Sequence, residues 1–311
     1  MKKILLLSFL GLSFGANAQT VLFEDSFETY NDFIITGIGN WTTLDLDQNP
    51  TYTGGSVGNP TWANAGAPQA FQIFNPTTAL VTNAGPADEE TRNFDPRTGS
   101  KYAASWAAVP SGAAPANEDW LISPPITLSS SDNLLTVFVK SLSDSYGLEE
   151  YSIGIYVGTG NPSSSDDFEL HPDATGMPAS FGDWEEVVLL LDEYAGQTVR
   201  IGIRNEGSDH YMLMVDDFKV ETGDVAGVND LFSKKFNMYP NPASDVVTIS
   251  NNESIVLNSI NISDINGRTV KQLSFENVND AQMNVSDLSS GIYFMNIATE
   301  GGNAVKKFIK K

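Results

Sequence analysis

The sequence lacks cysteine altogether and contains few histidines and few basic residues. Without cysteine the chain forms no disulfide, although a domain of ~200 residues buries about 70% of its unfolded surface and does not need one. Lysine and arginine number 17 against 39 acidic residues, which gives a formal net charge of -22. Such an acidic surface repels phosphate backbones, so it excludes nucleic acid as a partner and favours hard cations.

The sequence also lacks the common catalytic motifs. His171 and His210 are its only histidines, and neither belongs to an HExxH motif. No GxSxG nucleophile elbow is present. Paired carboxylates such as Glu149-Glu150 could support glycoside hydrolysis, but acidic residues are so abundant that adjacency carries little information. These absences favour a non-enzymatic protein over the alternative, a carboxylate-dependent hydrolase that acts on glycans.

Long apolar runs are absent except at the start of the chain. Residues 1–18 combine two lysines, an apolar run from Ile4 to Phe14 and small residues at Ala16 and Ala18. This order is typical of a secretory signal peptide cleaved before Gln19, and the run is shorter than the ~20 residues that a membrane anchor needs. The sequence therefore predicts a secreted protein with no transmembrane span in the mature chain.

Charge is distributed unevenly along the remainder. Residues 19–236 carry 32 acidic and nine basic side chains, whereas residues 237–311 carry seven and six. A difference of this size predicts separate domains. We expect one domain at 19–223, a linker at 224–236 that has few apolar residues and no periodicity, and a second domain at 237–311.

Short runs with alternating apolar residues dominate both expected domains. From Leu134 to Glu221 each run holds five to eight residues rich in valine, isoleucine, leucine and aromatics, and Gly, Asp, Ser or Pro separates one run from the next. No segment shows sustained helical periodicity, so the pattern predicts an all-β fold. We expect a jelly-roll β-sandwich followed by a small immunoglobulin-like β-sandwich.

The segment from Asn49 to Gly112 has a different composition, rich in Asn, Pro, Gly, Ala and Thr. Two apolar runs, AFQIF at 70–74 and KYAASWAA at 101–108, interrupt it. One interpretation is a set of long surface loops that carry binding function, and the other is a tolerated insertion. The sequence leaves both open.

The last 75 residues carry four motifs in order. The motifs begin with a YPNP opening and end with a lysine-rich final strand. They comprise Tyr239, Pro240, Asn241 and Pro242, then Gly267 and Arg268, then Gly291 and Tyr293, and finally Lys306 and Lys307. This part of the chain resembles the type A sorting domain of type IX secretion substrates. The resemblance implies a Gram-negative bacterium and recognition by the type IX secretion machinery, with removal of the domain and either lipopolysaccharide anchoring or release of the product.

The larger expected domain resembles a second family. The runs EDWLISPPITL at 118–128 and GDWEEVVLLLDEYAGQTVRIGIRNEGSDHYMLMVDDFKVE at 182–221 are similar to the cleaved-adhesin, or choice-of-anchor J, jelly roll. The resemblance spans residues 23–221 without the 49–112 segment. It implies a binding or adhesion module whose ligand is a glycan or a surface protein.

Asp216 is the strongest chemical signal in the sequence. In the run DDFKVE, strand alternation places Asp216 on the same face as Phe218 and Val220, so its carboxylate is expected to point toward the apolar side. An unpaired carboxylate there would cost several kcal/mol, and a Ca²⁺ ion held by six to eight oxygens would offset that cost.

The expected calcium ligands come from distant parts of the chain. Similar sandwiches hold a structural cation between the last strand and an acid of the first, which here implies Glu28 with Asp216. Asp45 and Asp47 of the run DLDQN are further candidates. This run departs from the fuller acidic pattern of the family, which places a second ion in doubt. The alternatives are a solvated acidic rim or an arginine partner such as Arg200 or Arg204.

Five tryptophans raise the possibility of sugar stacking. Trp120 and Trp184 lie within motifs beside expected strands and are expected in the core. Trp41, Trp62 and Trp106 are less constrained. Trp62, in a Gly- and Pro-rich stretch, is the candidate for an exposed ligand platform.

Overall fold

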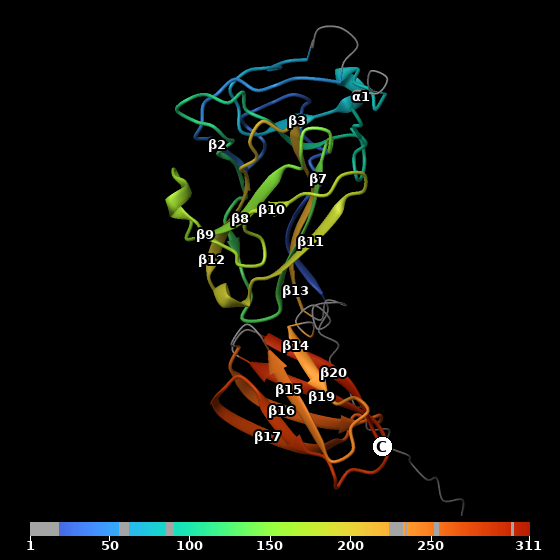
Figure 1. The fold of residues 1–311 in the computed structure, drawn as a ribbon. Helices are drawn as coiled ribbons and strands as arrows, with labels where there is room; N and C mark the ends of the chain where they lie inside the picture. The colour runs from blue at the N-terminus through green and yellow to red at the C-terminus, as the bar shows by residue number, and fades with distance from the viewer. Residues whose placement is uncertain are drawn as a thin grey trace, which may run out of the picture.

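A computed structural model describes residues 19–55, 62–84, 90–223, 233, 235–251, 255–299 and 302–311. The expected signal peptide at 1–18 lies outside these residues, as does most of the expected linker at 224–236. Within the described ranges no helix is long and apolar enough to cross a membrane. The fold is all-β, as the alternating runs predict, and Figure 1 shows strands β1 to β13 gathered in one body and β14 to β20 in another.

The N-terminal body is a sandwich of two antiparallel sheets. The first sheet has the order β11-β7-β13-β4-β3, and β1 pairs with β13. Its strands are β1 (Thr20–Asp25), β3 (Gln72–Phe74), β4 (Tyr102–Trp106), β7 (Asn133–Ser141), β11 (Glu185–Leu190) and β13 (Met212–Thr222). Because β13 pairs with β7 along one edge and with β4 and β1 along the other, it is the central strand of this sheet.

The second sheet has the order β10-β8-β12-β5-β2, with β6 paired to β12 and β9 to β8. Its strands are β2 (Thr42–Asp45), β5 (Asp119–Ile122), β6 (Ile126–Thr127), β8 (Glu150–Val157), β9 (Glu169–Leu170), β10 (Met177–Pro178) and β12 (Thr198–Asn205). Alternate apolar residues of the two sheets, such as Val137 and Val139 of β7 and Ile201 and Ile203 of β12, form one buried core. This burial is the main force that holds the sandwich together.

The central strand β13 contains an irregularity that changes which side chains face the core. Leu213 and Val215 belong to the core between the sheets, and so do Phe218 and Val220. The parity therefore changes between Val215 and Phe218, where the pairing with β7 shifts register and Asp217 adopts a left-handed φ of 45°. This geometry is that of a β-bulge.

The bulge corrects the expected orientation of Asp216. The expectation that Asp216 is buried is confirmed, but the face is wrong. Strict alternation placed Asp216 with Phe218 and Val220, whereas the register shift puts it on the side of Met214, away from the main core.

The 49–112 segment is an integral part of the sandwich. It supplies β3, β4 and the short helix α1 (Pro76–Ala79), whose first turn is capped by the Asn75 side chain. Its aromatic residues, including Phe74, Phe94 and Trp106, pack with Met212 and Met214 into a second buried cluster. Among its described residues, the N-terminal body also contains two single-turn 3₁₀ helices, Ser165–Asp167 and Asp192–Tyr194.

The C-terminal body is a smaller sandwich with its own core. One sheet has the order β14-β15-β18 and the other β17-β16-β19-β20. The strands are β14 (Phe236–Tyr239), β15 (Val246–Asn251), β16 (Leu257–Asp264), β17 (Thr269–Val278), β18 (Ala281–Asn284), β19 (Gly291–Thr299) and β20 (Gly302–Lys310). Phe236, assigned to the linker by its sequence, instead begins β14 and is buried in this core.

Candidate functional site

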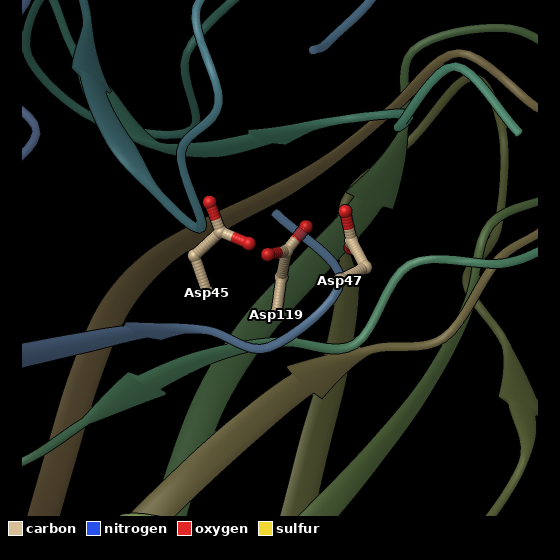
Figure 2. A group of neighbouring side chains, drawn as sticks. All are labelled: Asp45, Asp47 and Asp119. Carbon is tan, nitrogen blue, oxygen red and sulfur yellow. The ribbon is translucent and has the colours of Figure 1, made fainter. Parts of the chain in front are cut away.

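Three aspartates meet where two neighbouring strands of the second sheet come together. Asp45 ends β2, Asp119 begins β5, and the two are paired across the antiparallel ladder. Asp47 follows β2 by two residues. One carboxylate oxygen from each residue lies within 4.8 Å of the others. Figure 2 shows the Asp119 carboxylate between those of Asp45 and Asp47.

Asp119 is the buried member of this cluster, with 1% of its surface exposed. Its Oδ2 accepts a hydrogen bond of 2.6 Å from Asn117 Nδ2. Its Oδ1 is buried and has no hydrogen-bond partner among the described residues. Burial, followed by the nearby charges of Asp47 and Asp45, raises the pKa of Asp119 well above its usual value. The cluster is therefore electrostatically unsatisfied without a proton or a cation.

The other two carboxylates are held in place by backbone donors. The Gln48 N–H donates to Asp45 Oδ1 at 2.6 Å, and the Asn49 N–H donates to Asp47 Oδ1 at 2.8 Å. Burial and then the charge of Asp47 raise the pKa of Asp45, against the opposing effect of the Gln48 N–H. Three fixed carboxylates with an unpaired inner oxygen suit a hard divalent cation such as Ca²⁺, which binds oxygen ligands.

Sequence reasoning proposed Asp45 and Asp47 but missed Asp119. The distance along the chain hides the pairing, because only the register of β2 against β5 brings Asp119 beside Asp45. The available signal was an acid at the start of an otherwise apolar run, DWLI, where a carboxylate enters a buried strand.

Glu28 and Asp216 occupy a different place, on either side of the loop from Arg97 to Lys101. Glu28 Oε1 accepts from the backbone N–H groups of Ser100 and Lys101, each at 2.9 Å. Asp216 Oδ2 accepts from the N–H groups of Arg97 at 3.2 Å and Thr98 at 3.3 Å. Both carboxylates therefore accept hydrogen bonds from the backbone of the same loop.

These carboxylates are already partnered by the protein. Asp216 Oδ1 accepts from the Asp217 N–H at 2.8 Å, and Glu28 Oε2 accepts from Ser100 Oγ at 3.0 Å. Burial and then the charge of Asp217 raise the pKa of Asp216 to about 7, despite the backbone donors. An ion at Glu28 and Asp216 stays a prediction, and the unpaired Asp119 oxygen favours the other cluster.

The arginine alternative for Asp216 is wrong. The Arg200 guanidinium donates to backbone carbonyls, including Ser123 O at 2.9 Å. Arg204 forms an ion pair with Glu206. Arg97 contacts this region through its backbone N–H to Asp216 and through a side-chain ion pair with Asp217.

The exposed platform expected at Trp62 is also wrong. Trp62 is only 6% exposed, and its ring stacks on that of Trp106 with centroids 5.8 Å apart. Trp41 and Trp106 are buried too. Composition indicated a loop, but the aromatic residues of the 49–112 segment bury one another against β4 and β13, which local sequence does not reveal.

Within the part of the chain that the structure describes, neither histidine hydrogen-bonds to a nucleophilic side chain. His171 is buried, with Nε2 3.1 Å from the Leu190 carbonyl. His210 Nδ1 lies 3.9 Å from Glu149 Oε2. Glu149 is 1% exposed, and burial raises its pKa to about 8, although it accepts a hydrogen bond from the Tyr211 N–H.

The YPNP residues lie against the last strand of the chain. Asn241 Oδ1 accepts from the Ile309 N–H at 3.0 Å, and Asn241 Nδ2 donates to the Lys307 carbonyl at 3.2 Å. Tyr239, which precedes both prolines, remains half-exposed at the end of β14. The first and last of the four motifs are therefore in direct contact, because Asn241 hydrogen-bonds to the backbone of the lysine-rich strand.

The other two motifs form a turn and a strand start. Gly267 has a φ of 77° and closes a turn in which its N–H donates to the Asp264 carbonyl at 2.9 Å. Arg268 pairs with the Asp264 side chain at 3.1 Å. Gly291 begins β19, and Tyr293 stacks on Phe308 with centroids 5.5 Å apart. These contacts give the motif residues structural roles within the small sandwich.

Residues 237–311 match the family of secretion system C-terminal sorting domains. The match covers the motif-bearing C-terminal sandwich and confirms the resemblance seen in the sequence. The chain is accordingly a secreted protein, directed to the cell surface or the extracellular space. No curated protein matches the chain.

Solved structures similar to this chain include adhesin and carbohydrate-binding domains. The K3 cleaved adhesin domain of Lys-gingipain from Porphyromonas gingivalis W83 is 19% identical, with a TM-score of 0.39, and the match covers 66% of this chain and 100% of that domain. The K1 domain is 17% identical, with a TM-score of 0.37 and coverage of 66% and 99%. The CBM22-1 xylan-binding domain from Paenibacillus barcinonensis Xyn10C is 11% identical, with a TM-score of 0.36 and coverage of 68% and 99%. At these TM-scores the likenesses carry no functional conclusion.

Proposed function

We propose that this chain is a binding or adhesion protein exported by type IX secretion, whose N-terminal sandwich recognises a glycan or a surface protein. The sorting-domain match at 237–311 is the observation that carries the proposal. A chain delivered outside the cell by its C-terminal sandwich must act through its other body, which is the acidic sandwich of residues 20–222. After export, removal of the sorting domain and attachment to lipopolysaccharide or release are part of the same proposal.

The proposal includes a structural Ca²⁺ ion in the N-terminal sandwich. The cluster of Asp45, Asp47 and Asp119 supports this best, because Asp119 holds an unpaired oxygen in a buried site. A bound cation would compensate the three carboxylates, and carbonyls or water would supply further oxygens. The ion would fix the β2 to β5 edge and the loop after Asp45. Glu28 and Asp216 form the second candidate site.

A glycan hydrolase remains the alternative function, and one observation favours it. Glu149 has the raised pKa that a general acid needs. Its burial opposes this role, because a catalytic acid must reach the substrate. Incubation of the mature protein with a panel of polysaccharides separates the two functions: sugar release at enzymic rates that Glu149→Gln abolishes would contradict the binding proposal.

The direct test of the proposed function is an array of glycans and matrix proteins probed with the mature protein, with and without Ca²⁺. We expect selective retention on one ligand class and weaker retention after chelation, because loss of the ion loosens the sandwich. Equal, weak signals on every feature of the array would contradict a binding function.

A further inference from the structure

Tyrosines and acids line a cleft in the N-terminal sandwich, separate from the aspartate cluster. This tyrosine cleft has a volume of about 410 Å³. Small-molecule sites are typically roughly 300–1,000 Å³. The residues that define it are Tyr52, Tyr146, Tyr211, Glu90, Asp209 and His210. They come from the 49–112 segment, the turn after β7 and the entry to β13, which are far apart in sequence.

Hydrogen bonds fix the tyrosine rings. The Tyr146 hydroxyl donates to Glu90 Oε2 at 3.0 Å, and the Tyr52 hydroxyl donates to Asp209 Oδ1 at 2.7 Å. Tyr211 packs edge-on against Tyr146, with centroids 5.8 Å apart and an interplanar angle of 85°. Tyr211 is buried, whereas Tyr146 is 53% exposed. The cleft thus has a rigid inner wall and an accessible outer aromatic ring.

Two glycines shape the walls of the cleft. A Cβ at Gly54 would collide with the Tyr211 hydroxyl. A Cβ at Gly147 would come within 2.9 Å of His210 Nε2, and Gly147 has a left-handed φ of 100°. The backbone therefore approaches the Tyr211 and His210 side chains as closely as the absence of a side chain allows.

The charge of the cleft is negative. Glu90 forms a largely buried ion pair with Arg92, which compensates one carboxylate. Among the described residues no basic side chain forms an ion pair with Asp209, which is exposed and held at a left-handed φ of 57°. Aromatic rings beside an uncompensated carboxylate favour a cation, since both the ring faces and the carboxylate attract positive charge.

We propose that the tyrosine cleft binds the ammonium group of a lysine side chain on a partner protein. This inference rests on the proposed binding function and assigns it a site and a ligand chemistry. The chain's net charge of -22 draws a basic partner toward it at long range. Tyr146 then covers the alkyl stem and ammonium group, and Asp209 supplies the charge partner. A neutral sugar would leave the Asp209 charge uncompensated.

The test is calorimetric titration of a protein of residues 19–311, which keeps the sorting domain, with the peptide Gly-Lys-Gly-Lys-Gly. The same peptide with both lysines Nε-acetylated keeps the length and removes the charge, and xylohexaose serves as a neutral glycan probe. We expect binding of the lysine peptide only. Tyr146→Ala should weaken it by about tenfold through loss of the ring contact, and Asp209→Asn by a similar factor.

Two matched variants control for general effects. Tyr239→Ala removes a tyrosine that is also 53% exposed, but in the sorting domain. Asp132→Asn removes one charge from an aspartate with the same kind of backbone, at a φ of 58°. Both variants should bind the lysine peptide as the parent does. If the control variants bind the lysine peptide as weakly as Tyr146→Ala and Asp209→Asn do, the binding is non-specific charge attraction and the proposal is overturned.

The remaining outcomes separate this inference from the proposed function. Binding of xylohexaose but not of the lysine peptide, lost in Tyr146→Ala, would overturn the lysine proposal and leave a glycan-binding protein. Failure of the lysine peptide together with clear array binding that Tyr146→Ala leaves intact would place the ligand elsewhere. Failure of every probe and of the whole array would contradict both.

Discussion

Asp119 can be satisfied by a proton or by a metal ion, and the two cases differ in how the protein responds to chelation. If Ca²⁺ binds at Asp45, Asp47 and Asp119, calcium should raise the melting temperature of the parent, because binding to the native state alone stabilises it. The gain is about 2.7 kcal/mol when free calcium is a hundred times the Kd. Asp119→Asn should abolish the calcium response measured by differential scanning calorimetry.

The same measurement distinguishes the two candidate sites. Asp216→Ala should retain the calcium response if the ion lies at Asp119, although the variant loses the bonds to Arg97 and Thr98 and melts earlier in all buffers. A response that disappears in Asp216→Ala and persists in Asp119→Asn would assign the ion to Glu28 and Asp216. Identical parent curves with calcium and with chelator would contradict both sites.

Glu149 predicts a specific dependence of stability on pH. Its pKa is raised from 4.5 to about 8 in the folded protein, so the unfolded state releases this proton at lower pH than the folded state does. The Glu149 contribution to stability is therefore lost as pH rises from about 4.5 toward 8, by about 1.4 kcal/mol per pH unit. Glu149→Gln should be more stable than the parent by a margin that grows from pH 5 to pH 8, measured by denaturant unfolding.

Glu186→Gln is the matched control, because Glu186 is an exposed glutamate on another strand, whereas the charge of Glu150 itself contributes to the raised pKa of Glu149. His210 Nδ1 lies 3.9 Å from Glu149 Oε2, so only the difference between the Glu149→Gln variant and the parent isolates the glutamate. A difference that stays constant from pH 5 to pH 8 would show that Glu149 is ionised in the folded protein.

Among the elements, strands were more predictable than their irregularities. Period-two alternation predicts β7, β8, β11, β12 and β13 because alternate residues of each strand enter the main core. It cannot predict the bulge at Asp217, because one extra residue reverses the parity without changing the composition of the run. The face of Asp216 was therefore wrong although its burial was right. The Asp45 to Asp119 pairing was hidden for a related reason, since register between distant strands is not encoded locally.

The packing of Trp62 within the 49–112 segment indicates a structural role for this residue. Its ring packs against Phe74 and Trp106 in the aromatic cluster over β4 and β13, so Trp62→Ala should create a cavity. We expect a loss of about 3–5 kcal/mol in the free energy of unfolding. Trp62→Phe, which keeps an aromatic ring, should cost less. If Trp62→Ala is as stable as the parent but is no longer retained by a ligand on the array, Trp62 contacts the ligand and its structural role is contradicted.

At the scale of the whole molecule, the two sandwiches have separate cores but touch. Their buried clusters share no residue, and no strand of one pairs with a strand of the other among the described residues. Leu190 packs against the C-terminal core, and Lys235, just before β14, pairs with Asp173 at 2.8 Å. The change in charge along the sequence led us to expect separate domains at 19–223 and 237–311.

Deletion of residues 236–311 tests the division of labour between the two bodies. The cut precedes β14, so it removes every strand of the C-terminal sandwich and leaves the main core and the aromatic cluster intact. The truncated protein should stay in the periplasm in folded form, because its signal for crossing the outer membrane is lost while its own burial is unchanged. Cell fractionation measures its location, and near-ultraviolet circular dichroism of the purified protein measures its packing. Truncation should change the melting temperature of the N-terminal sandwich little, since among the described residues it uncovers Leu190, while Lys235, the partner of Asp173, is retained. A truncated protein that still appeared in the medium at the parent's level would show that export depends on residues other than those of the sorting domain.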